Sequence, residues 1–210
     1  MRQNLYSDKN LLPTKNNFDI IKKEDKTMLF WQTIDLEKEN LEYAEILNKF
    51  FKNQKESFHE EKLKKQTKGA YVLLKRMLSS LSINLDEQEI KANQYGKPYF
   101  ASLQLFFNIS HSKNLCAVAI SDKPVGIDIQ YLSRPNKKVA SRYFDKKSQL
   151  RMKLSPNKEN AFTKGWTTHE SLLKLFSNLR FKSGKVKTQF FKVKDCTNQV
   201  YFVAVSTRKN

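Results

Sequence analysis

The chain has 210 residues, of which 39% are hydrophobic and 12% aromatic, and its formal net charge is +18. This apolar content excludes a globally disordered chain, and five glycines and five prolines are too few for a fibrous protein. The charge favours an anionic partner, which could be nucleic acid, a membrane surface, a phosphorylated small molecule or an acidic protein. Because enrichment in Lys and Asn can also reflect the base composition of a genome, the charge alone selects no function.

Two cysteines, Cys116 and Cys196, are too few for a disulfide framework and lack the spacing of metal ligands. Cys116 lies in the apolar run LCAVAI and is expected to be a small buried residue. The N-terminus has no apolar core of the signal-peptide type, and no run approaches the roughly 18 apolar residues of a membrane span. We therefore expect a cytoplasmic protein without a membrane partner.

The first part of the chain predicts an extension, a strand and two helices. Residues 1–27 are polar and predict a loosely attached extension, whereas residues 28–34 predict a strand. Asp35 is a candidate N-cap for a helix that runs to about Phe51. A second helix is expected over residues 57–80, and the lysines in its first half form either a solvated face or an anion-binding face.

The remainder of the chain predicts mainly strands, followed by two helices and a closing hairpin. The expected elements are a strand at 89–93, a turn at 95–98, strands at 103–109, 115–120 and 125–131, helices at 137–152 and 158–177, and a hairpin of 187–194 with 199–206. The three consecutive strands predict an antiparallel meander. The order of elements predicts an α+β fold in which two halves are related.

An aspartate stands inside the apolar run VGIDIQ. Asp128 and Gln130 are two residues apart in an expected strand, so their side chains leave one face, while Ile127 and Ile129 face the core. One carboxylate, one amide oxygen and a second carboxylate from elsewhere would suit a hard cation such as Mg²⁺. The alternative is an aspartate that caps a turn or pairs with a lysine.

Glu170 and Lys174 stand four residues apart in an expected helix and therefore share a face. They could form an ordinary surface ion pair, but Trp166 and the neighbouring leucines indicate that the helix is largely buried. His111 lies between Ser110 and Ser112 at the end of a strand. These hydroxyls, turn amides and imidazole could hold a phosphate, although His111 could equally be an ordinary turn residue.

Taken in order, these segments resemble 4′-phosphopantetheinyl transferases of the surfactin-synthetase-activating (Sfp) type. The resemblance runs from about residue 28 to the C-terminus and rests on four segments: YGKP at 95–98, FNISHS at 107–112, VGIDIQ at 125–130 and WTTHESLLK at 166–174. It implies two similar α+β lobes related by a pseudo-two-fold axis, with the active site in the cleft between them. The lobes would comprise residues 28–122 and 123–210.

The resemblance also implies an activity, a cofactor and partners. The phosphopantetheine arm of coenzyme A would be transferred to a serine of an acidic apo carrier protein, and adenosine 3′,5′-bisphosphate would be released. The implied residue roles are Mg²⁺ binding by Asp128, Gln130 and Glu170; phosphate contact by Lys174; nucleotide 3′-phosphate contact by Ser110 and His111; proximity to the adenine for Lys97 and Pro98; and a further phosphate contact by Thr67. Glu170 would take the proton of the serine hydroxyl, directly or through a water. We expect a monomer that binds no nucleic acid.

The chain departs from the family pattern at several positions. Members of this type often have Glu in place of Gln130 and Lys in place of His169, and the arginines expected in the second helix are lysines. A neutral amide still offers an oxygen to Mg²⁺ but contributes less charge. The segment Arg142–Lys153, which mixes basic and apolar residues, is a candidate docking surface for the carrier or an ordinary amphipathic helix.

Two alternatives remain open at the level of sequence. A basic nucleic-acid-binding protein would explain the charge and the aromatic residues but would leave Asp128 and Glu170 without a role. A degenerate transferase fold that only binds its ligand would explain the departures at Gln130 and His169.

Overall fold

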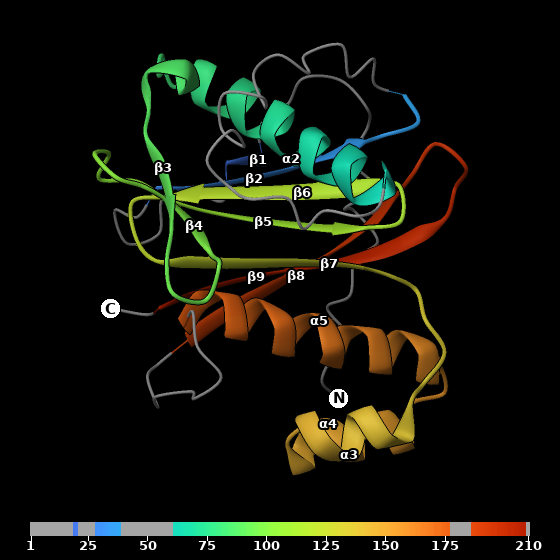
Figure 1. Ribbon diagram of the computed structural model, residues 1–210. Coiled ribbons are helices and arrows are strands. Elements are labelled where there is room, and N and C mark those ends of the chain that lie inside the picture. The colour runs from blue at the N-terminus through green and yellow to red at the C-terminus, as the bar shows by residue number, and fades with distance from the viewer. Residues whose placement is uncertain (1–18, 21–27, 39–60, 177–185, 209–210) are drawn as a thin grey trace.

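The computed structural model describes residues 19–20, 28–38, 61–176 and 186–208. In chain order the elements are β1 (Asp19–Ile20), β2 (Leu29–Asp35), α2 (Glu61–Ser79), a short 3₁₀ helix (Leu85–Glu87), β3 (Ile90–Ala92), β4 (Pro98–Phe100), β5 (Phe106–Ser112), β6 (Leu115–Ser121), β7 (Val125–Tyr131), α3 (Lys137–Tyr143), α4 (Lys146–Leu154), α5 (Lys158–Phe176), β8 (Val186–Lys194) and β9 (Val200–Arg208) (Figure 1). The chain therefore has the mixed α and β composition that the sequence predicts.

The first sheet is antiparallel, with strand order β1-β2-β6-β5, and α2 covers one of its faces (Figure 1). All seven residues of β6 are buried, because both faces of this strand are covered. Cys116, Val118 and Ile120 pack in the cluster that includes α2, which confirms that Cys116 is a small buried residue. The intervening Ala117 and Ala119 face the second sheet.

The second sheet is antiparallel, with strand order β7-β9-β8, and it lies between the first sheet and α5 (Figure 1). Ile127 and Ile129 of β7 are fully buried in the cluster shared with Trp31 of the first sheet. These isoleucines thus face the core, as the alternation in VGIDIQ predicts, and Asp128 leaves the other face of the strand.

Small side chains form much of the buried face of α5, and the helix approaches the second sheet closely there. Thr163, Thr167 and Ser171 recur at intervals of four residues and are completely buried. The Ser171 hydroxyl lies 2.8 Å from that of Ser206 on β9. A Cβ atom at Gly126 of β7 would overlap the carbonyl oxygen of Ser171, so glycine is needed where the helix crosses this strand.

The helix expected over residues 137–152 is two helices. Phe144 is extended, and the Asp145 side chain accepts a hydrogen bond from the Ser148 amide at 2.6 Å, which begins α4 as a new helix. Phe144 packs with Ala140 and Phe162, and this small cluster holds the α3–α4 pair against α5.

The expected meander of three strands is wrong at its third strand. β5 and β6 form a hairpin, but β7 pairs with β9 and belongs to the second sheet. Three polar side chains of β5 bond the edge of β7 in place of a backbone ladder, so β7 lies beside β5 without joining its sheet. The strand β4 is not expected from the sequence, which predicts a turn up to Pro98. The other strands after residue 89 and helix α5 lie within about three residues of their expected positions.

Some expectations concern residues that the structure does not describe. The helix from Asp35 to Phe51 falls almost entirely there, as does most of the extension over residues 1–27. Asp35 itself ends β2. Among the helices in the described ranges, none combines the length and apolar character that crossing a membrane requires.

Candidate functional site

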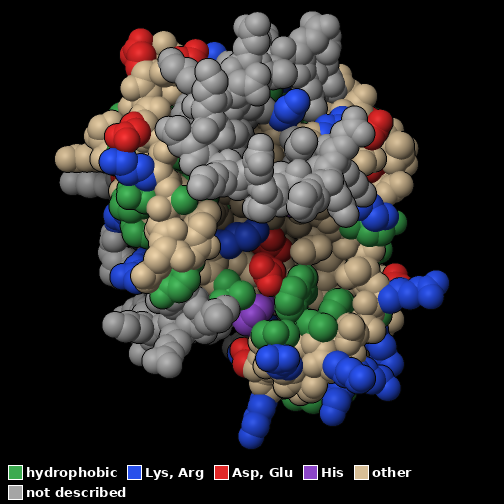
Figure 2. Space-filling model, viewed as in Figure 1, with side chains coloured by type: hydrophobic (Ala, Val, Ile, Leu, Met, Phe, Trp, Pro, Cys, Tyr) green, Lys and Arg blue, Asp and Glu red, His purple; other side chains and the backbone are tan. Residues whose placement is uncertain are grey.

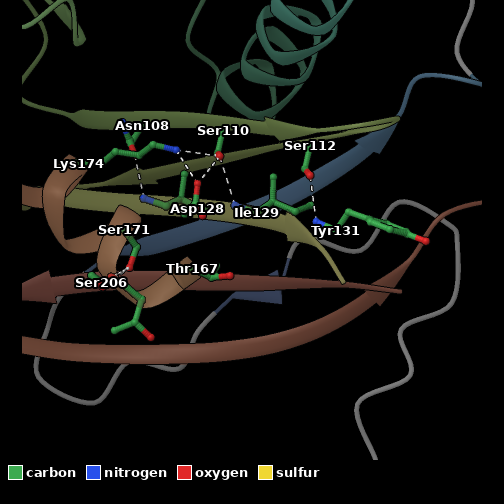
Figure 3. A network of polar contacts seen from close by, with 12 residues as sticks. Asn108, Ser110, Ser112, Asp128, Ile129, Tyr131, Thr167, Ser171, Lys174 and Ser206 are labelled. Carbon is green, nitrogen blue, oxygen red and sulfur yellow. Dashed lines mark hydrogen bonds and ion pairs between the residues drawn. The ribbon is translucent and has the colours of Figure 1, made fainter. Parts of the chain in front are cut away.

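Asp128 is a buried carboxylate that contacts polar side chains from two other elements. It leaves the α5-facing side of β7 and is only 2% exposed. Its Oδ1 atom accepts hydrogen bonds from the Ser110 hydroxyl and from the Lys174 ammonium, both at 2.8 Å (Figure 3). Its Oδ2 atom is also buried and has no hydrogen-bond partner among the described residues. One oxygen of the carboxylate is therefore fixed, whereas the hydrogen-bonding capacity of the other is not used by the described residues.

Lys174 brings the last turn of α5 to Asp128. Its Nζ atom bonds Ser110 Oγ at 2.8 Å as well as Asp128 Oδ1, so three side chains from two strands and a helix converge on one point. The Lys174 side chain is 27% exposed and that of Asp128 is 3% exposed, so the ion pair joins a partly exposed lysine to a buried carboxylate. The sequence hypothesis that Asp128 could pair with a lysine is thus confirmed, and that lysine is Lys174.

The edge of β7 is held by side chains of β5 rather than by a backbone ladder. The amide of Ile127 donates to Asn108 Oδ1 at 2.8 Å, that of Ile129 to Ser110 Oγ at 3.2 Å, and that of Tyr131 to Ser112 Oγ at 2.9 Å (Figure 3). We call Asn108, Ser110 and Ser112 the β5 polar row. Sequence reasoning missed this role, although polar residues at alternate positions of an apolar strand were a usable signal.

Glu170 lies one helical turn before Lys174 and shares its environment. Burial raises the pKa of its carboxyl group, the nearby Asp128 carboxylate raises it further, and the Lys174 ammonium lowers it. Asp128 and Lys174 are thus the charged groups that act on the Glu170 carboxyl group, and Glu170 shares a helix face with Lys174, as the four-residue spacing predicts.

The residues that could hold a hard divalent cation here are two carboxylates and an amide. Asp128 has a buried Oδ2 atom without a hydrogen-bond partner among the described residues, and the Asp128 charge raises the pKa of the Glu170 carboxyl group. Gln130 follows two residues after Asp128 on the same strand and is half-buried. In the described ranges, no three His, Cys, Asp or Glu side chains form a group able to hold a metal ion. Two carboxylates and an amide could hold Mg²⁺ where substrate and water complete its shell.

His111 and Ser110 belong to the same neighbourhood but differ in exposure. Ser110 is 5% exposed, and its hydroxyl already bonds Asp128, Lys174 and the Ile129 amide. His111 is exposed, and its pKa is lowered by the protein packed around the imidazole and by the Lys174 ammonium, against the opposing effect of Asp128. The imidazole is thus the more accessible of the two expected phosphate contacts.

Lys97 reaches α5 from the turn between β3 and β4. Its ammonium donates to the backbone carbonyls of Lys174 at 2.6 Å and Val125 at 3.2 Å. Burial and the Lys174 charge lower the pKa of Lys97 to about 8. Pro98 follows as the first residue of β4 and is half-buried. Sequence reasoning did not foresee that the Lys97 ammonium would bind this helix, because the contact spans 77 positions of sequence.

Thr67 lies on α2 and is half-buried. This helix packs against β2, β5 and β6 of the first sheet.

An aromatic cluster lies beside Glu170 on the outer side of α5. Tyr143 of α3 packs edge-on against Trp166 at 5.6 Å between ring centroids and lies 5.1 Å from the His169 ring. Burial lowers the pKa of His169. Tyr143 itself is exposed, and so are Leu150 and Leu154 on α4. In Figure 2 the face seen is hollowed near its middle, where acidic, basic, histidine and hydrophobic side chains gather.

Comparisons with known proteins agree with the resemblance found in the motifs. The chain is 34% identical over 108 residues to the 4′-phosphopantetheinyl transferase gsp of Aneurinibacillus migulanus, which covers 50% of this chain and 45% of that protein. It is 33% identical over 107 residues to the 4′-phosphopantetheinyl transferase Sfp of Bacillus subtilis strain 168, covering 49% of this chain and 48% of that protein. A match to the 4′-phosphopantetheinyl transferase HetI of a Nostoc species is 30% identical over 118 residues.

The matches cover only part of each protein. The matched segments span about half the length of the curated relatives. No protein-family model matches the chain.

Proposed function

We propose that this protein, a relative of the Sfp-type 4′-phosphopantetheinyl transferases over half of its length, transfers the phosphopantetheine arm of coenzyme A to a serine of an apo carrier protein. Adenosine 3′,5′-bisphosphate is the second product. The observation that carries this proposal is the cluster of Asp128, Glu170 and Lys174, in which a buried carboxylate oxygen lacks a partner within the described residues.

The proposed architecture is two similar α+β lobes, residues 28–122 and 123–210, with the active site in the cleft between them. In support, all strands of the four-stranded sheet precede residue 122, and all strands of the three-stranded sheet follow residue 124. The cluster lies where β5 of one sheet meets β7 of the other, which is the position that a site between two lobes would occupy.

Three residues would hold Mg²⁺. Asp128 would bind it through Oδ2, Glu170 through its carboxylate and Gln130 through its amide oxygen. The bound ion would neutralise charge on the pyrophosphate of coenzyme A, which eases departure of the bisphosphate. Because Lys174 and Ser110 hold Oδ1, they would orient Asp128 with Oδ2 turned to the ligand.

Glu170 would act as the general base. Burial and the Asp128 charge raise its pKa, so its carboxylate binds a proton more strongly than a free glutamate. The proton of the carrier serine would move to this carboxylate as the serine oxygen attacks the phosphorus. Lys174, whose side chain is partly exposed, would meet the negative charge of the phosphates.

The nucleotide would lie on the β5 side of the cluster. His111 and Ser110 would contact the 3′-phosphate. The Ser110 hydroxyl would at the same time keep its hydrogen bonds to Asp128 and Lys174. Lys97 and Pro98 would lie beside the adenine, with the Lys97 ammonium turned toward α5. Thr67 on α2 would make a further phosphate contact.

The carrier protein would dock on α3 and α4. No residue of α4 is buried, and Leu150 and Leu154 are exposed between basic residues of this helix. Such a surface suits an acidic partner with an apolar patch. We also propose that the protein acts as a monomer in the cytoplasm, which size-exclusion chromatography and cell fractionation would test.

The first prediction tests the transfer itself. The protein is incubated with coenzyme A, Mg²⁺ and several apo carrier proteins, and each carrier is weighed by mass spectrometry. We expect a mass increase of one phosphopantetheine, which is lost when Mg²⁺ is chelated. We expect Asp128→Ala to lose it as well, with its circular dichroism spectrum retained. The absence of any mass increase in all carriers, or unchanged turnover of Asp128→Ala, would contradict the proposal.

A further inference from the structure

The tip of the β3–β4 hairpin reaches across both sheets to the end of α5 (Figure 1). Asn93 shapes this tip, because its Oδ1 atom accepts hydrogen bonds from the amides of Tyr95 at 2.9 Å and Lys97 at 3.0 Å. Gly96 supplies the positive φ of 76° that closes the turn. The hairpin therefore presents the Lys97 side chain from a defined backbone position.

The Lys97 ammonium then joins two elements that carry the site. It donates to the carbonyl of Lys174 in the last turn of α5 and to the carbonyl of Val125 at the start of β7. Carbonyls in the last turn of a helix lack partners within the helix, and a cation there also complements the helix dipole. One amine thus ties the end of α5 to the strand that bears Asp128.

We propose that Lys97 is a positioning residue, which holds the last turn of α5 against β7 so that the Lys174 ammonium meets Asp128 and Ser110. The side chain of Lys174 bonds Asp128 at 2.8 Å, and its backbone carbonyl is the group that Lys97 holds at 2.6 Å. A displacement of this turn would move Lys174, and with it the fixed oxygen of Asp128. The inference rests on the proposed function insofar as it concerns turnover.

The charges around Lys97 agree with a role imposed by the fold. Its ammonium is held close to the Lys174 ammonium and away from water, and both effects lower its pKa. The two carbonyl contacts offset part of the cost of burying this ammonium.

The test separates positioning from direct nucleotide contact. Lys97→Met keeps the length of the side chain but removes its donors, whereas Lys97→Arg keeps a cation that reaches both carbonyls. Lys91→Met is the matched control, because Lys91 lies on β3 of the same hairpin, is 53% exposed and pairs with Glu89. For each variant we would measure kcat, KM for coenzyme A, and amide hydrogen exchange in the last turn of α5.

We expect Lys97→Met to lower kcat by about 10- to 100-fold, because small displacements of a reacting group have effects of this size. KM for coenzyme A should stay within about threefold of the wild type, and exchange in residues 173–176 should accelerate. Lys97→Arg should restore much of kcat, and Lys91→Met should match the wild type. A raised KM with unchanged kcat would instead identify Lys97 as a nucleotide contact and overturn the inference.

Two further outcomes keep this test independent of the proposed function. If the wild type transfers nothing to any carrier, faster exchange in the last turn of α5 in Lys97→Met still supports the positioning role. Unchanged exchange there overturns it. If Lys97→Met melts too low to assay, Lys97→Gln carries the same comparison, because its shorter neutral side chain cannot reach both carbonyls.

Discussion

At the scale of single residues, the site depends on how closely α5 approaches β7. Gly126 stands two residues before Asp128, and its missing side chain lets the backbone of Ser171 and Leu175 lie directly against the strand. This approach brings Lys174, in the same turn of the helix, within 2.8 Å of Asp128. The glycine is therefore as much a part of the site's geometry as the charged residues are.

Gly126→Ala should destabilise the fold, because its Cβ atom would overlap backbone atoms of α5 that cannot move without displacing the helix. We expect a loss of about 1–3 kcal/mol in the free energy of unfolding, measured in urea. Gly69→Ala is the matched control, because the added atom would overlap the end of the Leu36 side chain and touch Cys116 Sγ, and neither of these is a backbone atom. Equal losses in both variants would contradict this explanation.

At the scale of elements, the β5 polar row joins the two sheets. β7 is an edge strand of its own sheet, and the edge amides of Ile127, Ile129 and Tyr131 would be unpaired without the row. Side chains bond them without extending either sheet, so β5 and β7 adjoin although they share no backbone ladder. The row thereby fixes the register of Asp128 relative to Ser110.

Asn108→Ala should leave the buried amide of Ile127 without an acceptor and lower the free energy of unfolding by about 1–3 kcal/mol. Hydrogen exchange at Ile127 should accelerate more than at Tyr131, whose bond to Ser112 is retained. Ser141→Ala, which removes an exposed bond within α3, serves as the control and should be near neutral. If hydrogen exchange accelerated equally at all amides of β7, the explanation that each side chain of the β5 polar row holds its own amide would be wrong.

At the scale of the whole molecule, the formal charge of +18 gives the protein a long-range attraction for anions. Both proposed substrates are anionic. The Asp128–Lys174 ion pair contributes no net charge to this field. The attraction of substrates therefore depends on other charged residues than those of the proposed site.

Association with an acidic carrier should therefore depend on salt. Raising ionic strength from about 0.05 to 0.3 M should lower kcat/KM for the carrier by roughly tenfold, because exposed charges are screened over about 10 Å at 0.1 M. The kcat at saturating carrier should change little. A carrier whose acidic residues have been neutralised is the control and should show a weak salt dependence. A salt-independent kcat/KM with the acidic carrier would exclude steering.

Local patterns in the sequence were sufficient to predict most elements and the candidate residues. The alternation in VGIDIQ predicts that Ile127 and Ile129 face the core, and the four-residue spacing predicts that Glu170 and Lys174 share a helix face. Periodicity reports burial and orientation within one element, and for this reason these predictions succeed.

Only the tertiary structure decided which elements adjoin. The sequence does not show that β7 leaves the expected meander, that the β5 polar row bonds its edge, or that the Lys97 ammonium reaches α5 across 77 positions. Pairing of Asp128 with Lys174 likewise spans 46 positions. Contacts between distant segments depend on the packing of the whole chain, and a local pattern carries no information about the partner that packing supplies.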